Sequence, residues 1–94
     1  MIEKKNSETT EGIQRRFFAV LDVLISNGSI ASLASFCDSH GLNRVKYSNL
    51  RSFYTTGRCS ARYKVIDLDA LAYISADFGV SLLWLIHGKG NMFI

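Results

Sequence analysis

The apolar side chains of the chain recur at helical spacing in several segments, and glycines separate these segments. Side chains three and four positions apart share one face of an α-helix, so such a stripe predicts a helix with one buried face. Asn27-Gly28 is expected to end the first helix, because glycine readily adopts the left-handed conformation of a helix C-cap. The first stripe consists of Ile13, Phe17, Val20, Leu21 and Leu24, and the residues off it include Gln14, Arg15, Asp22 and Ser26.

Two short helices are predicted next, on either side of Gly41. The first would be capped by Ser29 and would bury a stripe of Ile30, Leu33, Ala34 and Cys37. The second is predicted over residues 43–54, with the side chain of Asn43 as its N-cap. Its apolar positions are Tyr47, Leu50 and Tyr54, and its remaining face consists of Arg44, Lys46, Ser48, Asn49, Arg51 and Ser52.

The C-terminal third predicts two more helices. A fifth helix is expected from Leu82 to His87, capped by Ser81 and ended by Gly88. Residues 58–64 form either a loop or the start of the fourth helix, and no segment alternates apolar and polar residues as a strand does. The pattern therefore predicts a compact all-α, five-helix domain over residues 13–94, preceded by a flexible tail over residues 1–12. The fourth helix would end at Gly79 and bury Val65, Leu68, Leu71, Ala72, Ser75 and Phe78.

Charge is distributed unevenly along these predicted helices. The formal net charge is +3 over 94 residues, a length that suits one domain. Between Asp38 and Asp67 no carboxylate occurs, yet six of the eleven Lys and Arg lie there. Concentrated cations without acids attract polyanions such as nucleic acids, and an ordinary solvated helix face is the alternative. In the tail, Lys4 and Lys5 are offset by three Glu, which favours a solvated tail over a DNA-contacting arm.

Other kinds of chemistry have little support in the sequence. Cys37 and Cys59 lack metal-ligand spacing and only two His are present, so we expect no metal site, reduced thiols and a buried Cys37. Asp67 and Asp69 suit a helix start, and no nucleophile–base pair or phosphate-binding glycine loop accompanies them. We therefore expect a protein that is not an enzyme, with no cofactor and no small-molecule ligand. A polar N-terminus and the lack of a long apolar run predict a cytoplasmic location without membrane insertion.

Gly41 stands between the second and third helices at the spacing of a helix-turn-helix. The small Cys37 lies four positions before it, and the apolar Tyr47 and Leu50 lie six and nine positions after it. The chain also ends in FGVSLLWLIHGKGNM over residues 78–92, which is similar to the "fGVs..WLl.GkG.M" ending of small phage-type repressors. On these residues the chain resembles the lambda-repressor-like helix-turn-helix proteins of the Cro/CI and XRE type, over about residues 13–92. Leu33 replaces the glutamine that often contacts a phosphate in that family.

The resemblance implies that helix 43–54 enters the major groove of double-stranded DNA, with its N-terminal residues toward the base edges. Arg44 would pair with a guanine, Asn49 with an adenine, and Val45 would touch a thymine methyl group. The candidates for phosphate or base contacts are Asn43, Lys46, Arg51 and Ser52, with Lys46 and Arg51 assigned to phosphate. Beside the groove, the DNA backbone would be held by Arg58, Arg62 and Lys64.

The expected function is therefore sequence-specific DNA binding by a transcriptional regulator, a repressor of a phage or other mobile element that acts by occupying its operator. Because operators are commonly two-fold, a homodimer is expected. The alternative is a protein-interaction adaptor or antirepressor on the same scaffold. For Trp84 itself, a place in the core under the first helix is favoured over the interface. The residues considered for the dimer surface are Trp84, Leu85, Ile86, Met92 and Phe93.

Overall fold

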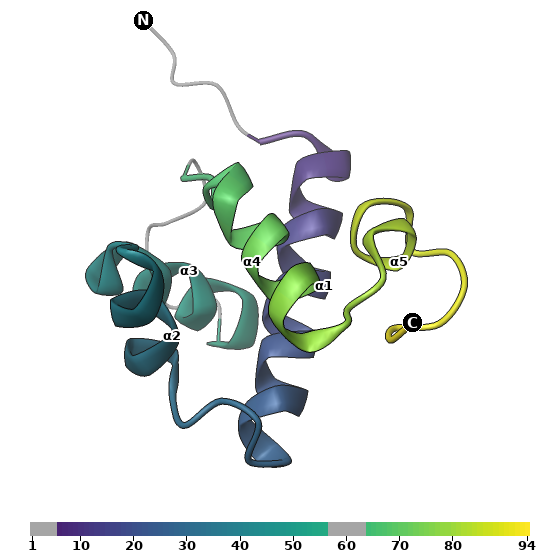
Figure 1. The fold of residues 1–94 in the computed structure, drawn as a ribbon. Helices are drawn as coiled ribbons and strands as arrows, with labels where there is room; N and C mark the ends of the chain where they lie inside the picture. Colours follow the sequence, from purple (N-terminus) through teal and green to yellow (C-terminus); the bar gives the residue numbers. More distant parts are fainter. Residues whose placement is uncertain (1–5, 57–63) are drawn as a thin grey trace, which may run out of the picture.

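The computed structural model describes residues 6–56 and 64–94, and within these ranges it contains five α-helices and no strand (Figure 1). The helices pack around one hydrophobic core, so the compact all-α prediction is confirmed for the described residues. In the part of the chain that is described, no helix combines the length and the apolar character needed to cross a membrane. The helices are α1 (Glu8–Ser26), α2 (Leu33–His40), α3 (Arg44–Thr56), α4 (Leu68–Phe78) and α5 (Leu82–His87).

Helix α1 is longer than the apolar stripe indicated. It begins at Glu8 because Ser7 caps it, accepting a hydrogen bond from the backbone N–H of Thr10 at 3.1 Å. The prediction of a flexible tail over residues 1–12 is therefore wrong for residues 8–12, and residues 1–5 lie outside the described ranges. The predicted apolar stripe does face the core, with Phe17, Val20 and Leu21 fully buried.

Helices α2 and α3 form a tight unit around Gly41, which has a φ of 67° and ends α2. A side chain would be strained in this left-handed conformation, and the reversed chain is closed by a hydrogen bond from the Leu42 N–H to the Cys37 carbonyl at 2.8 Å. The N-cap of α2 is Ser32 rather than the predicted Ser29, so Ile30 is buried from the preceding loop. The predicted Asn43 cap of α3 is confirmed, since Asn43 Oδ1 accepts from the Lys46 N–H at 3.0 Å.

The predicted buried face of α4 is right for Leu71 and Phe78, and Gly79 ends the helix as predicted, but the face is wrong for Leu68 and Ala72. Leu68 is 82% exposed and Ala72 is exposed, whereas Ala70, Leu71 and Ile74 are buried. The apolar residues of α4 itself are spread over most of its circumference, so its sequence contains two apolar stripes with helical spacing. Packing against the other helices determines which of the two stripes is buried. The helix begins at Leu68 with Asp67 as N-cap, which leaves Val65 in the preceding extended segment.

The prediction for α5 is confirmed at both ends: Ser81 accepts from the Trp84 N–H, and Gly88 ends the helix in a left-handed conformation. Arg16 of α1 holds this end, donating from Nε to the Leu85 carbonyl and from Nη2 to the Ile86 carbonyl, both at 2.8 Å. Ser81 N–H also donates to the Met92 carbonyl at 2.9 Å, which returns the C-terminus to the core.

The packing of α5 corrects part of the expected dimer surface. Leu85 is fully buried, and Trp84 and Met92 pack against the core, so these three side chains belong largely to the fold. This agrees with the core position favoured for Trp84. Ile86 of α5 and Phe93, which follows that helix, remain 36% and 37% exposed, and Leu82 and Leu83 of α5 are more exposed still.

Candidate nucleic-acid interface

Helix α3 has one buried face and one exposed polar face. Tyr47 and Leu50 are fully buried, and they hold the helix against α1 and α2. On the other side, positions 44, 45, 48, 49 and 52 follow the i, i+1, i+4, i+5, i+8 spacing of a single helix face. Val45 is 69% exposed, and Ser48 and Ser52 are exposed as well. The predicted base-reading residues Arg44, Val45 and Asn49 therefore lie together on the side of α3 opposite Tyr47 and Leu50, where Arg44 and Val45 are exposed and Asn49 is partly exposed.

This exposed face forms one wall of an open groove of about 550 Å³, and the N-terminal turn of α2 forms the other. The groove brings four predicted DNA-binding residues next to a helix start, where backbone N–H groups point outward. The lining residues are Ser32, Leu33, Ala34, Arg44, Val45, Ser48, Asn49 and Arg51.

The cations of α3 do not stand in an acid-free environment. Arg44 donates from Nε to Asp38 Oδ1 at 2.7 Å and from Nη2 to Asp38 Oδ2 at 2.5 Å. This pairing holds the pKa of the Asp38 carboxyl below its usual value and raises the pKa of Arg44, in both cases chiefly through the side-chain hydrogen bond. Asp38 was only the boundary of the acid-free stretch in the sequence, and folding brings it back across the Gly41 turn.

The other two cations of α3 also meet carboxylates. Arg51 donates from Nε to Asp22 Oδ1 of α1 at 2.9 Å, with Nη2 at 2.7 Å from the same oxygen. Lys46 Nζ lies 3.5 Å from Asp67 Oδ1, and 5.8 Å from the centre of the Tyr47 ring. The sequence gap in acids is thus filled in space by α1, α2 and the start of α4. All three pairs are partly exposed, so they restrain these side chains more than they stabilise the fold.

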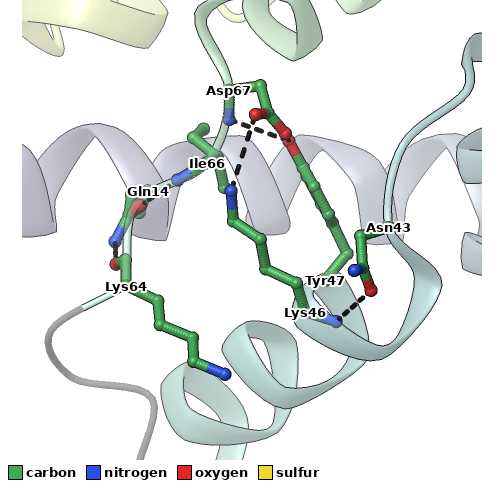
Figure 2. A network of polar contacts seen from close by, with 7 residues as sticks. All are labelled: Gln14, Asn43, Lys46, Tyr47, Lys64, Ile66 and Asp67. Atoms are coloured by element: carbon green, nitrogen blue, oxygen red, sulfur yellow. Dashed lines mark hydrogen bonds and ion pairs between the residues drawn. The ribbon is translucent and has the colours of Figure 1, made fainter.

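A polar network fixes the segment that leads into α4 beside α3 (Figure 2). The Tyr47 hydroxyl donates to Asp67 Oδ2 at 2.7 Å and accepts from the Asp67 backbone N–H at 2.9 Å. Burial, followed by the hydrogen bond to Asp67, raises the pKa of Tyr47 well above its usual value. The same bond holds the pKa of Asp67 below its usual value, with Lys46 as a smaller cause.

Gln14 of α1 completes this network from the other side (Figure 2). Its Oε1 accepts from the Ile66 N–H at 2.7 Å, and its Nε2 donates to the Tyr54 hydroxyl at 2.7 Å and to the Lys64 carbonyl at 3.4 Å. Gln14 is only 1% exposed, so its placement off the buried face in the sequence reading was wrong. A buried amide with all these partners is favourable, and its partners 40 to 52 residues away carry no local sequence signal.

The remaining predicted contact residues are placed as follows. Asn43 is exposed and uses its side-chain oxygen to cap α3. Lys64 is exposed, and its carbonyl is held by Asn6 as well as Gln14. Arg58 and Arg62 lie outside the described residues.

The described residues also bear on the predictions for cysteine and metal. Cys37 is fully buried as predicted, and burial raises the pKa of its thiol. Within residues 6–56 and 64–94, no group of three His, Cys, Asp or Glu side chains is arranged to hold a metal ion.

Comparison with known proteins adds no assignment. No family model matches the chain, and no match was found among curated proteins or among solved structures.

Proposed function

We propose that this domain is a lambda-repressor-like helix-turn-helix regulator that binds double-stranded DNA with α3 in the major groove. The observation that carries the proposal is the exposed face of α3 bearing Arg44, Val45 and Asn49, supported from behind by the buried Tyr47 and Leu50. A helix presented in this way over a short turn has the dimensions that the major groove admits. The Gly41 turn and the packing of α2 against α3 support the same interpretation.

In the proposed complex, α3 contributes base contacts near its start and phosphate contacts along its sides. The Arg44 guanidinium pairs with a guanine, the Asn49 carboxamide with an adenine, and Val45 contacts a thymine methyl group. Lys46, Arg51 and Lys64 contact phosphates. A phosphate must compete with Asp67 for Lys46 and with Asp22 for Arg51. The chain then acts as a repressor of a phage or mobile element by occupying the operator.

Two copies would bind a two-fold operator. The exposed apolar side chains of α5 and the C-terminus are the proposed contact between copies, and they include Leu82, Leu83, Ile86 and Phe93. Burial of exposed apolar side chains is the usual driving force for a stable dimer.

A protein-interaction adaptor is the second candidate, and the paired cations favour it. Asp22, Asp38 and Asp67 offset the charge of the three α3 cations, which weakens attraction for a bare phosphate backbone. The adaptor proposal predicts that the chain binds duplexes weakly and without sequence preference, and that a protein partner covers α3 instead.

Selection of bound duplexes from a random pool separates the two candidates. The DNA-binding proposal predicts an enriched motif whose affinity falls steeply with salt, and a palindromic motif would support the dimer. A pool that yields no enrichment at low salt would remove the regulator proposal.

A further inference from the structure

The carboxylate of Asp38 has no role in the proposed function so far, although it occupies the side chain expected to read a guanine. It lies on α2, and Arg44 is the first residue of α3, so the pair spans the turn of the helix-turn-helix. Both side chains are more than half exposed, at 54% for Asp38 and 61% for Arg44. A pair this exposed contributes little to folding, so folding stability does not account for its two-bond geometry.

The atoms used in this pair are informative. A guanidinium carries five N–H groups in a plane, one on Nε and two on each Nη. Asp38 accepts from Nε and from Nη2, which form the side edge of the plane. The end edge, made of one N–H from Nη1 and one from Nη2, is left for another partner. Guanine offers O6 and N7 side by side in the major groove, and two parallel N–H groups match them.

We propose that Asp38 is a positioning residue that holds the Arg44 guanidinium with its end edge directed at a guanine in the major groove. This inference rests on the proposed DNA-binding function and adds to it a determinant of specificity outside α3. Without the carboxylate, Arg44 samples many rotamers and loses them on binding, which lowers affinity for the correct base.

The charge of Asp38 gives the arrangement a second consequence. A carboxylate at the edge of the interface repels phosphates, so it weakens binding to every duplex alike. Its positioning of Arg44 strengthens binding only in the complex in which Arg44 pairs with a guanine. Asp38 therefore lowers general affinity and raises discrimination, and these opposite effects distinguish a positioning residue from a merely structural one.

The test compares Asp38→Asn with the wild type on the selected duplex, on duplexes with single-base changes, and on an unrelated duplex. The guanine read by Arg44 is the position at which Arg44→Ala loses its base preference. Asp38→Asn should reduce the preference for that guanine by about three- to tenfold, the scale of ordering one long side chain. Its affinity for the unrelated duplex should rise, because a charge that repels phosphates is removed. In the double variant that combines Arg44→Ala with Asp38→Asn, the second substitution should cause no further loss of base preference, because Asp38 acts through Arg44.

Asp69→Asn is the matched control, since Asp69 is also an exposed aspartate and lies in the first turn of α4. It changes charge equally and should leave the base preference unchanged. In the free protein, ¹⁵N relaxation of the Arg44 Nε–H group should report a restricted side chain in the wild type and a mobile one in Asp38→Asn.

Two results would overturn the inference while leaving DNA binding intact. One is an unchanged base preference in Asp38→Asn, and the other is an Arg44 side chain that is equally mobile in both proteins. A wild-type chain that binds no duplex at low salt would instead remove the proposed function, and the inference with it.

Discussion

The hydroxyl of Tyr47 makes two hydrogen bonds to Asp67, donating to its carboxylate at 2.7 Å and accepting from its backbone N–H at 2.9 Å. One buried side chain of α3 thereby fixes the N-cap residue of α4. This contact and the bonds of Gln14 hold the segment that carries Lys64 and the last residues before α4 beside α3.

Removal of the Tyr47 hydroxyl should destabilise the fold. Tyr47→Phe keeps the buried ring but leaves the Asp67 N–H without this partner, and we expect a loss of about 1–2 kcal/mol in the free energy of unfolding. Denaturant unfolding followed by circular dichroism measures the change. Tyr73→Phe is the control, because the Tyr73 ring stacks on His40 and its hydroxyl has no hydrogen bond among the described residues. Equal losses in both variants would contradict the role assigned to the Tyr47–Asp67 bonds.

The same pair predicts a dependence of stability on pH at the acid end. The folded-state pKa of Asp67 is lowered, so its contribution is complete above the usual aspartate pKa of about 4 and is lost as pH falls through the folded value. Asp67→Asn should flatten the loss of stability below about pH 4. Denaturation midpoints measured from pH 2 to pH 7 test this, and parallel curves for the two proteins would count against it.

At the alkaline end the sign is reversed. The pKa of Tyr47 is raised by burial and that of Tyr54 is raised by burial too, so the folded state keeps both protonated after the unfolded chain begins to ionise. Stability should therefore be complete below about pH 10 and fall as pH rises further. Titration of tyrosine absorbance in the wild type, Tyr47→Phe and Tyr54→Phe isolates these two hydroxyls, and each should ionise in the folded protein at a higher pH than a free tyrosine does. Ionisation of either hydroxyl at the pH of free tyrosine while the helix signal is intact would contradict this expectation.

Gln14 should be difficult to replace. Gln14→Ala leaves the buried Ile66 N–H without its acceptor, and we expect a cost of about 2 kcal/mol. Amide hydrogen exchange should quicken at Ile66 more than at Leu85, whose N–H donates to the Ser81 carbonyl in α5. If the exchange rates of both amides rose by the same factor, after correction for the change in global stability, Gln14 would not act locally.

The features that came from local signals were predicted well. The stripe of α1, the Gly41 turn, the Asn43 cap and the bounds of α5 all depend on residues a few positions apart. The start of α1 was missed although Ser7 and the acidic Glu8 and Glu11 supply an ordinary N-terminal signal.

The electrostatics of the candidate interface could not be predicted from the sequence. Asp22 lies 29 residues from Arg51, and Asp67 lies 21 residues from Lys46, so only the packing of α1, α3 and α4 brings these groups together. An acid-free stretch of chain is therefore not an acid-free surface. The buried amide of Gln14 escaped notice for the same reason.

The Asp22–Arg51 pair yields a prediction about general DNA affinity. Asp22→Asn frees the guanidinium for a phosphate, so affinity for any duplex should rise a few-fold at low salt and the slope against log salt should steepen by about one. Fluorescence anisotropy at several salt concentrations measures both quantities, with Asp69→Asn as the charge-matched comparison. A fall in affinity for Asp22→Asn would mean that Arg51 does not contact the backbone.

The most direct test of the central claim is the affinity of Ser48→Glu for the selected duplex, measured beside Ala72→Glu. Both positions are exposed in the middle of a helix, and both variants add one negative charge. Only Ser48 lies on the face of α3 that we assign to the DNA major groove. We predict a loss of at least tenfold for Ser48→Glu and a change within about twofold for Ala72→Glu, because a carboxylate inside the groove faces both bases and phosphates. Equal affinity of the two variants for the duplex would contradict the placement of α3 in the major groove.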